Sequence, residues 1–295
     1  MEIFEAWPIT LFIVAGLLGL VVGSFLNVVA YRIPIMMERA WREQCAELKS
    51  QPLTPPSHIA DGSRFDLWWP PSACPACGGA IAAQHNVPVF GFLWLKGRCA
   101  RCGAKISARY PVVESLAGML AVTVAYVFGP SWQTVAALGF AWTLLALTLI
   151  DLDHKLLPDS LTLPLLWAGL LVNVPVAGDG LFAPLRSSVI GAAFGYLALW
   201  SVYKLFKLVT GKEGMGYGDF KLLAAIGAWL GWQLLPVVIL LSAVVGSVVG
   251  IALIAFGGRS SQTAIPFGPY LAAAGLIAML WGERLIQLYQ AWFFR

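Results

Sequence analysis

Long apolar segments dominate this sequence and restrict the fold it can adopt. Residues 8–31 run for 24 positions without a charged side chain. A helix needs about 20 apolar residues to cross the hydrocarbon core of a bilayer. Seven further apolar segments are predicted as helices, at 112–128, 131–150, 160–176, 187–208, 220–235, 236–256 and 264–282. We therefore expect an all-α polytopic membrane protein with about eight transmembrane helices in a lipid bilayer. The segment 220–235 is short and broken by glycines, so it is also compatible with a re-entrant helix.

The composition agrees with this class of protein. Of the 295 residues, 59% are hydrophobic and 12% are charged, and the mean hydropathy is +0.77. Soluble domains carry about 25% charged residues. The net charge is only +4 and no long basic run is present, so we expect no nucleic-acid partner.

The distribution of basic residues predicts the orientation. Cytoplasmic loops of membrane proteins carry an excess of Lys and Arg. Glu2 and Glu5 precede the first apolar segment and Arg32 follows it, which favours a retained helix with an external N-terminus over a secretory signal. With residues 32–110 in the cytoplasm, sixteen of the nineteen Lys and Arg residues lie on that side.

Residues 32–110 form a polar insert between the first two apolar segments, and this insert contains two C-x₂-C pairs. They are Cys74-Pro-Ala-Cys77 and Cys99-Ala-Arg-Cys102. Four thiolates at this spacing are a common ligand set for tetrahedral zinc. We predict one structural zinc ion per chain, because no position would remain open for water. Two disulfides are the alternative, which a reducing compartment disfavours.

Two aspartates lie where an apolar segment meets its loop. Asp151 directly follows Leu149-Ile150, and Asp219 ends the run Gly214-Met-Gly-Tyr-Gly-Asp219 before an apolar segment. Acids at the edge of membrane helices are candidates for function. Two aspartates that share a site do not easily both ionise, so one can act as an acid while the other activates water. We predict a catalytic pair that hydrolyses amides at the cytoplasmic face, and leave open which member is acid and which is base.

The glycines before Asp219 predict a binding surface beside it. Glycine tolerates positive φ and lets another backbone approach closely, as an extended substrate would require. We predict that Gly214, Gly216, Gly218 and Lys221 bind the substrate. Asp219 capping the next helix is the alternative interpretation. Asp159, after Pro158, is predicted to be such an N-cap.

Together these motifs resemble the type IV prepilin peptidases, which are bifunctional leader peptidase/N-methyltransferases and membrane aspartic proteases of the GxGD type. The resemblance covers nearly the whole chain. It implies that Asp151 and Asp219 are catalytic and that the domains are a first transmembrane helix at 1–31, a cytoplasmic zinc-binding insert at 32–110 and a transmembrane aspartic peptidase domain at 111–295. It rests on Gly23-Ser-Phe-Leu-Asn-Val-Val-Ala-Tyr-Arg32, the cysteine pairs, Tyr110-Pro-Val-Val-Glu114, Ile150-Asp-Leu-Asp-His-Lys-Leu-Leu-Pro-Asp159, Gly214-Met-Gly-Tyr-Gly-Asp-Phe-Lys221 and Pro266-Phe-Gly-Pro-Tyr270.

The resemblance also implies two reactions in the cell inner membrane. The first removes the basic leader of prepilins and pseudopilins after a glycine, and the second methylates the new N-terminus with S-adenosyl-L-methionine. The sequence contains no GxGxxG-type nucleotide loop, so the residues themselves do not indicate where the methyl donor binds. The insert and the segment from Asn27 to Arg32 are the candidate regions.

Two other classes of protein fit the apolar pattern. A polytopic transporter with a regulatory zinc domain would also place acids on its helices, but near the bilayer midplane and often between repeated halves. Here both acids lie at one edge, and no internal repeat is evident. A non-enzymatic subunit of a secretion machine is the other alternative, and it should tolerate replacement of either aspartate.

Overall fold

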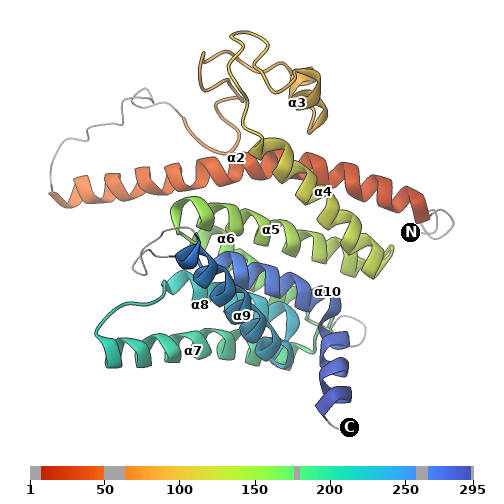
Figure 1. The fold of residues 1–295 in the computed structure, drawn as a ribbon, viewed down its shortest axis with the longest axis vertical. Helices are drawn as coiled ribbons and strands as arrows, with labels where there is room; N and C mark the ends of the chain where they lie inside the picture. Colours follow the sequence, from red (N-terminus) through yellow and green to blue (C-terminus); the bar gives the residue numbers. More distant parts are fainter. Residues whose placement is uncertain (1–7, 50–63, 176–179, 257–264, 294–295) are drawn as a thin grey trace. The chain divides into compact units, whose positions relative to one another are not determined.

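Helices make up the regular structure, as predicted. The computed structural model describes residues 8–49, 64–175, 180–256 and 265–293, and within these ranges it contains helices and two isolated β-bridges. Figure 1 shows their order in the chain. The described helices of 14 residues or more are α2 (Pro8–Lys49), α4 (Arg109–Phe128), α5 (Trp132–His154), α6 (Asp159–Val172), α7 (Leu185–Thr210), α8 (Tyr217–Leu230), α9 (Leu235–Ala255) and α10 (Gly268–Phe293). The one-turn helix α3 (Phe90–Trp94) and two 3₁₀ turns complete the set.

The eight predicted apolar segments each correspond to one helix of the described chain. Six of these helices are long and apolar enough to cross a membrane, namely α2, α4, α5, α7, α9 and α10. The helices α6 and α8 have 14 residues each, so they rise about 21 Å at 1.5 Å per residue. The chain is thus a polytopic membrane protein in which two of the apolar helices are shorter than the rest.

The described residues divide into two compact units, one within Trp7–Thr123 and the other within Val124–Arg295. In the first unit α2 and α4 pack antiparallel through small residues. A Cβ added at Gly23 would lie 2.6 Å from the Cα of Glu114, and one added at Gly19 would lie 2.6 Å from the carbonyl oxygen of Ala117. Small residues allow such close approach of membrane helices. The α2 helix also continues beyond residue 31 to Lys49, well past the predicted end of the first apolar segment.

In the second unit α8 is the central helix. It packs against α6, α7 and α10, and its residues from Asp219 to Leu230 are buried, Lys221 excepted. The contact with α7 is close because glycine faces glycine: a Cβ added at Gly191 would lie 2.3 Å from the carbonyl oxygen of Gly227. A helix enclosed in this way presents almost no side chain to lipid, and its first turn carries Asp219 into the interior of the unit.

The C-terminal end of α8 is held by a buried asparagine. The side-chain amide of Asn173 donates hydrogen bonds to the carbonyl oxygens of Ala228 and Trp229 at 3.1 and 2.9 Å. Its side-chain oxygen accepts from the backbone N–H groups of Phe182 and Ala183. The last carbonyls of a helix have no partner within the helix. Asn173 supplies that partner, so it fixes α8 along its axis from the end opposite to Asp219.

Candidate active site and metal centre

Asp151 lies in the last turn of α5 and is buried, with 4% of its surface exposed. The helix ends there because Lys155 adopts the left-handed conformation at φ 54° and its N–H closes the last turn on the carbonyl of Asp151. The backbone N–H of Gly268 donates a hydrogen bond to Oδ2 of Asp151 at 2.9 Å. Gly268 is the first residue of α10, where backbone N–H groups have no acceptor within the helix. The carboxylate of Asp151 is therefore oriented by the N-terminus of a helix 117 residues away in sequence.

Only a glycine fits at position 268. A Cβ built there would lie 2.6 Å from Oδ2 of Asp151 and 3.2 Å from Cδ2 of Leu157. Contacts below 3.0 Å require one of the two groups to move. The resemblance described above includes Pro266–Tyr270 only as a motif, and the residues alone gave no signal for this contact.

Asp219 lies in the first turn of α8 and is also buried, with 8% of its surface exposed. The two aspartates come from different helices and meet beside Leu157, which lies against Gly218, next to Asp219, and against Gly268, whose N–H bonds to Asp151. Asp219 does not cap α8, because the N-cap position is occupied by Gly216, where no side chain makes a capping bond. The alternative interpretation of Asp219 as a helix cap is therefore wrong.

The three glycines before Asp219 differ from one another in what surrounds them. None of them has positive φ, so that part of the reasoning from sequence is wrong. Close approach does apply to two of them: an added Cβ would lie 2.9 Å from the ring of Phe206 at Gly214, and 2.8 Å from Cβ of Leu157 at Gly218. At Gly216 nothing lies nearer than 3.9 Å, and the nearest atom is Oδ2 of Asp219. Gly216 therefore leaves open space next to the acid.

Lys221 and Asp159 form an ion pair. The Nζ atom of Lys221 lies 2.7 Å from both carboxylate oxygens of Asp159. The predicted N-cap role of Asp159 is wrong, because Pro158 occupies the cap position and Asp159 is the first helical residue. The pair joins the N-terminal ends of α6 and α8, beside Asp219. A substrate group that binds Lys221 would therefore also meet the carboxylate of Asp159.

The four cysteines of the insert meet at one point. Their Sγ atoms all lie within 4.8 Å of one another, and all four thiols are free. Both C-x₂-C pairs form the same turn, in which the N–H of Gly78 bonds to the carbonyl of Cys74 and the N–H of Gly103 to that of Cys99. These glycines have φ of 66° and 70°, a region that favours glycine.

The spacing of the sulfurs fits a tetrahedral metal ion. In a zinc–thiolate site with bonds of about 2.3 Å, the sulfurs lie about 3.8 Å apart. The Sγ atoms of Cys74 and Cys102 are 3.9 Å apart. Backbone N–H groups of Cys102 and Arg101 lower the pKa of the Cys99 thiol to about 6, whereas burial and the neighbouring thiols raise the pKa of Cys102 to about 11. Within the described residues this is the one cluster of four such ligands, and the fifth cysteine, Cys45, lies exposed on α2.

The residues considered for methyl transfer have structural partners. The side-chain amide of Asn27 donates to the carbonyl oxygens of Gly23 and Tyr110, at 3.2 and 3.4 Å. The guanidinium of Arg32 donates to the carbonyl oxygens of Asp66 and Pro70, at 2.7 and 2.6 Å. These contacts join α2 to α4 and to the insert, and they identify no pocket for the methyl donor.

Fold and site together define a class of protein: a polytopic helical membrane protein with two buried aspartates at helix ends and a cluster of four cysteines that could hold a metal ion. Comparisons with known proteins narrow this class. Residues 17–128 match the model of the bacterial peptidase A24 N-terminal domain, and residues 138–251 match that of the type IV leader peptidase family. The chain belongs to the type IV leader peptidase family.

Curated relatives of similar length support this membership. The chain is 53% identical to the prepilin leader peptidase/N-methyltransferase of Aeromonas salmonicida and 50% identical to that of Pseudomonas aeruginosa, each over 98% of this chain and 97% of the relative. It is 52% identical to the protein of the same name from Burkholderia pseudomallei, over 91% of this chain and 84% of the relative. No solved structure gives a significant match.

Proposed function

We propose that this protein removes the leader from prepilins and pseudopilins and then methylates the new N-terminus. The observation that carries the peptidase activity is the pair of buried aspartates at the ends of α5 and α8. The near full-length similarity to prepilin leader peptidase/N-methyltransferases supports this function. It does not support the alternative of a transporter with a regulatory zinc domain.

The aspartate pair can carry out hydrolysis of a peptide bond with one proton shared between its members. The ionised carboxylate takes a proton from water as the water oxygen attacks the scissile carbonyl. The protonated carboxyl group donates its proton as the C–N bond breaks and the amine leaves. Gly268 acts as a positioning residue, because its N–H fixes the direction in which Asp151 presents its oxygens.

The substrate meets this pair at the cytoplasmic edge of the inner membrane. This orientation follows from the positive-inside distribution of Lys and Arg, which also puts the cysteine insert in the cytoplasm. The residues around the cut have to be extended, because the carbonyls of a helix are already bonded. We propose that Gly214, Gly216 and Gly218 border the extended segment, and that Lys221 contributes together with Asp159.

Methyl transfer from S-adenosyl-L-methionine to the new amine is the second proposed reaction. It rests on the names of the relatives. We propose that residues 111–295 perform the cleavage, while the first helix (1–31) and the insert (32–110) contribute to methyl transfer.

The decisive experiment uses the purified full-length protein in detergent with a prepilin and isotopically labelled S-adenosyl-L-methionine. We expect a shortened pilin that carries label on its N-terminal nitrogen. Intact prepilin after long incubation would refute the peptidase activity. Shortened but unlabelled pilin would refute the methyltransferase activity alone.

Zinc is proposed as the resident metal of the cysteine cluster, in a structural role. Four protein thiolates leave no coordination position for water or substrate. We expect about one zinc ion per purified chain, and near-complete loss of zinc in the Cys74→Ser/Cys102→Ser variant. The Cys45→Ser variant is the matched control and should keep its zinc, because Cys45 lies outside the cluster. Stoichiometric zinc in the double variant would place the ligands elsewhere.

The proposed binding surface is best tested at Gly216, because a side chain there meets no packed atom. We expect Gly216→Val to slow leader cleavage by about 10- to 100-fold, since the new side chain fills the space next to Asp219. The thermal midpoint should stay within a few degrees of the native value. Gly139→Val is the matched control, because it adds the same side chain to open space on α5. Native cleavage rates in Gly216→Val would remove Gly216 from the binding surface.

A further inference from the structure

The cysteine insert exposes more large apolar side chains than a water-soluble domain of its size normally does. Trp68 is 78% exposed and Trp94 is 80% exposed. Phe90 and Leu93 are exposed as well, by 60% and 63%. Phe90, Leu93 and Trp94 follow the spacing i, i+3, i+4 on α3, so they lie on one side of that helix. What covers these side chains follows from two contacts that hold the insert against α2 and α4.

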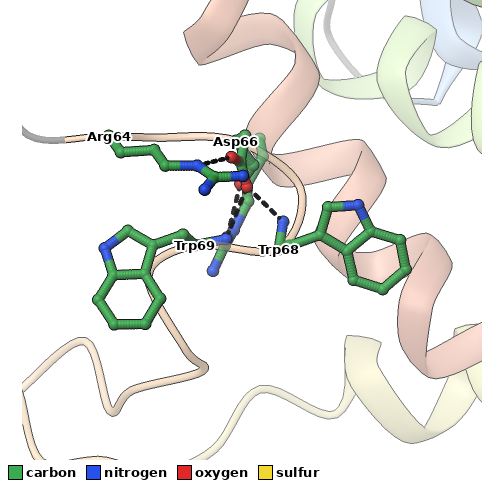
Figure 2. Close-up of polar contacts among 5 residues, drawn as sticks. Arg64, Asp66, Trp68 and Trp69 are labelled. Carbon is green, nitrogen blue, oxygen red and sulfur yellow. Dashed lines mark hydrogen bonds and ion pairs between the residues drawn. The ribbon is translucent and has the colours of Figure 1, made fainter.

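The first contact joins the turn at residues 66–70 to α2. The Arg32 guanidinium donates to two carbonyl oxygens of this turn, those of Asp66 and Pro70. The carboxylate of Asp66 accepts from the N–H groups of Trp68 and Trp69 at 2.8 and 2.7 Å and pairs with Arg64. Figure 2 shows this arrangement, with the two indole rings pointing away from each other. The Arg64 side chain and these backbone donors hold the pKa of Asp66 below its usual value, so the carboxylate is charged at neutral pH.

The turn places Trp68 beside the apolar part of α2. The ring of Trp68 stacks on that of Phe25, with 5.7 Å between centroids. Phe25 precedes Tyr31, the end of the apolar stretch, by six residues, which is about 9 Å along a helix. The side chain of Trp68 therefore lies beside the part of α2 that is within the bilayer.

The second contact joins α3 to α4. The carboxylate of Glu114 accepts the N–H of Val89 at 2.7 Å. Val89 has φ 59° and ψ −51°, a conformation that a β-branched residue rarely adopts. The bond to Glu114 fixes this residue, and α3 begins immediately after it. Glu114 lies five residues into α4, about 7.5 Å along the helix.

Both contacts act at the same depth. Gly23 of α2 packs directly on Glu114 of α4, so Phe25 and Glu114 lie at one level of the helix pair. That level falls inside the apolar stretch of both helices, where the surrounding medium is lipid. Exposed Lys96 and Arg98 follow α3 and provide cations for lipid phosphates. Aromatic and Leu side chains on one face with basic residues nearby are typical of segments that lie in a membrane interface.

We propose that the cysteine insert is seated in the phospholipid bilayer, with Trp68, Phe90, Leu93 and Trp94 among the headgroups and first acyl carbons beside α2 and α4. The insert is then a peripheral membrane element as well as a metal-binding one. The exposed apolar side chains of the insert are then covered by the same bilayer that α2 and α4 cross. The lipid surface is continuous from these helices to α3.

Photo-crosslinking in a defined bilayer tests this proposal. The full-length protein carries p-benzoylphenylalanine in place of Trp94 or Trp68, in nanodiscs of phosphatidylethanolamine and phosphatidylglycerol. After irradiation, intact mass measurement counts covalent lipid adducts. Trp41 is the matched control, because it is an exposed tryptophan on α2 nine residues beyond Arg32. We expect at least about ten times more lipid adduct at 94 and 68 than at 41. Equal adduct at all three positions, or crosslinks from 94 to protein, would overturn the proposal.

Quenching by lipids with brominated acyl chains gives a second measurement that does not rely on the crosslinker. The Trp94→Phe protein should lose part of the quenching seen in the native protein, whereas Trp41→Phe should lose none. The Trp94 side chain is largely exposed, so its replacement should leave the fold intact, and retained zinc verifies this. Unchanged quenching in Trp94→Phe would also overturn the proposal.

Discussion

Replacing either aspartate by alanine, Asp151→Ala or Asp219→Ala, is expected to abolish leader cleavage, with a loss of about 10⁴-fold or more in kcat/KM. Each change removes one of two groups that act together on one water molecule and one leaving amine. The double variant should therefore be no slower than the worse of the single ones, because losses within such a unit do not add. Initial rates of pilin release from a purified prepilin measure this.

The amount of protein in the membrane separates catalysis from folding in this experiment. Both variants should accumulate like the native protein, since neither aspartate forms an ion pair that the described structure records. Glu213→Gln is a suitable control, because Glu213 is an exposed acid that pairs with Lys207. Surface pairs of this kind contribute about 0–1 kcal/mol to stability. Near-native cleavage by either aspartate variant would refute the assignment.

Gly268→Ala is expected to reduce kcat for cleavage by about 100-fold with little change in KM. The added methyl group would lie 2.6 Å from Oδ2 of Asp151, so the carboxylate has to turn away from the N–H that orients it. A displacement of about 1 Å in a reacting group can reduce a rate by 10². Substrate binding should be less affected, because no contact with the leader is proposed at this residue. Steady-state kinetics with a prepilin substrate measures both constants.

Gly275→Ala is the matched control for this variant. It adds the same methyl group to the same helix, where the neighbour is the buried apolar side chain of Ile226 at 3.0 Å and not a carboxylate. We expect Gly275→Ala to change the thermal midpoint more than the rate. An equal loss of kcat in both variants would show that any disturbance of α10 is sufficient, and Gly268 would then have no positioning role.

Much of the helical framework follows from local composition. The predicted segment 187–208 corresponds to α7 at Leu185–Thr210, and 236–256 corresponds to α9 at Leu235–Ala255. The agreement is close because the ends of a continuous apolar run also mark the ends of its helix. Asp151 and Asp219 were selected for the same reason, as acids at the ends of such runs. The continuation of α2 to Lys49 was missed because its last turns are charged, with Glu38 and Arg42 paired along the helix.

The contacts that give the site its geometry depend on residues far apart in sequence. The N–H of Gly268 reaches Asp151 across 117 residues, and Lys221 reaches Asp159 across 62. Every residue except proline has a backbone N–H, so no sequence pattern shows which of these groups will bind a distant carboxylate. The role of Asn173 was missed in the same way, since its partners are carbonyls of α8 and N–H groups of a loop. Side-chain chemistry can be read from the sequence, whereas backbone donors acquire their function only from the fold.

The length of α8 has a consequence for how water reaches the aspartates. At about 21 Å this helix is some 9 Å shorter than the hydrocarbon core of a typical bilayer. Tyr203 of α7 packs on Tyr217 at the start of α8, and α7 continues to Thr210, so the end of α8 that carries Asp219 stops short of this neighbour. Because α6, α7 and α10 surround α8, lipid does not contact it and the bilayer does not adjust to its length. The hydrolytic water therefore approaches the aspartates past protein side chains, so its supply is set by the residues of this chain and not by the thickness of the host membrane.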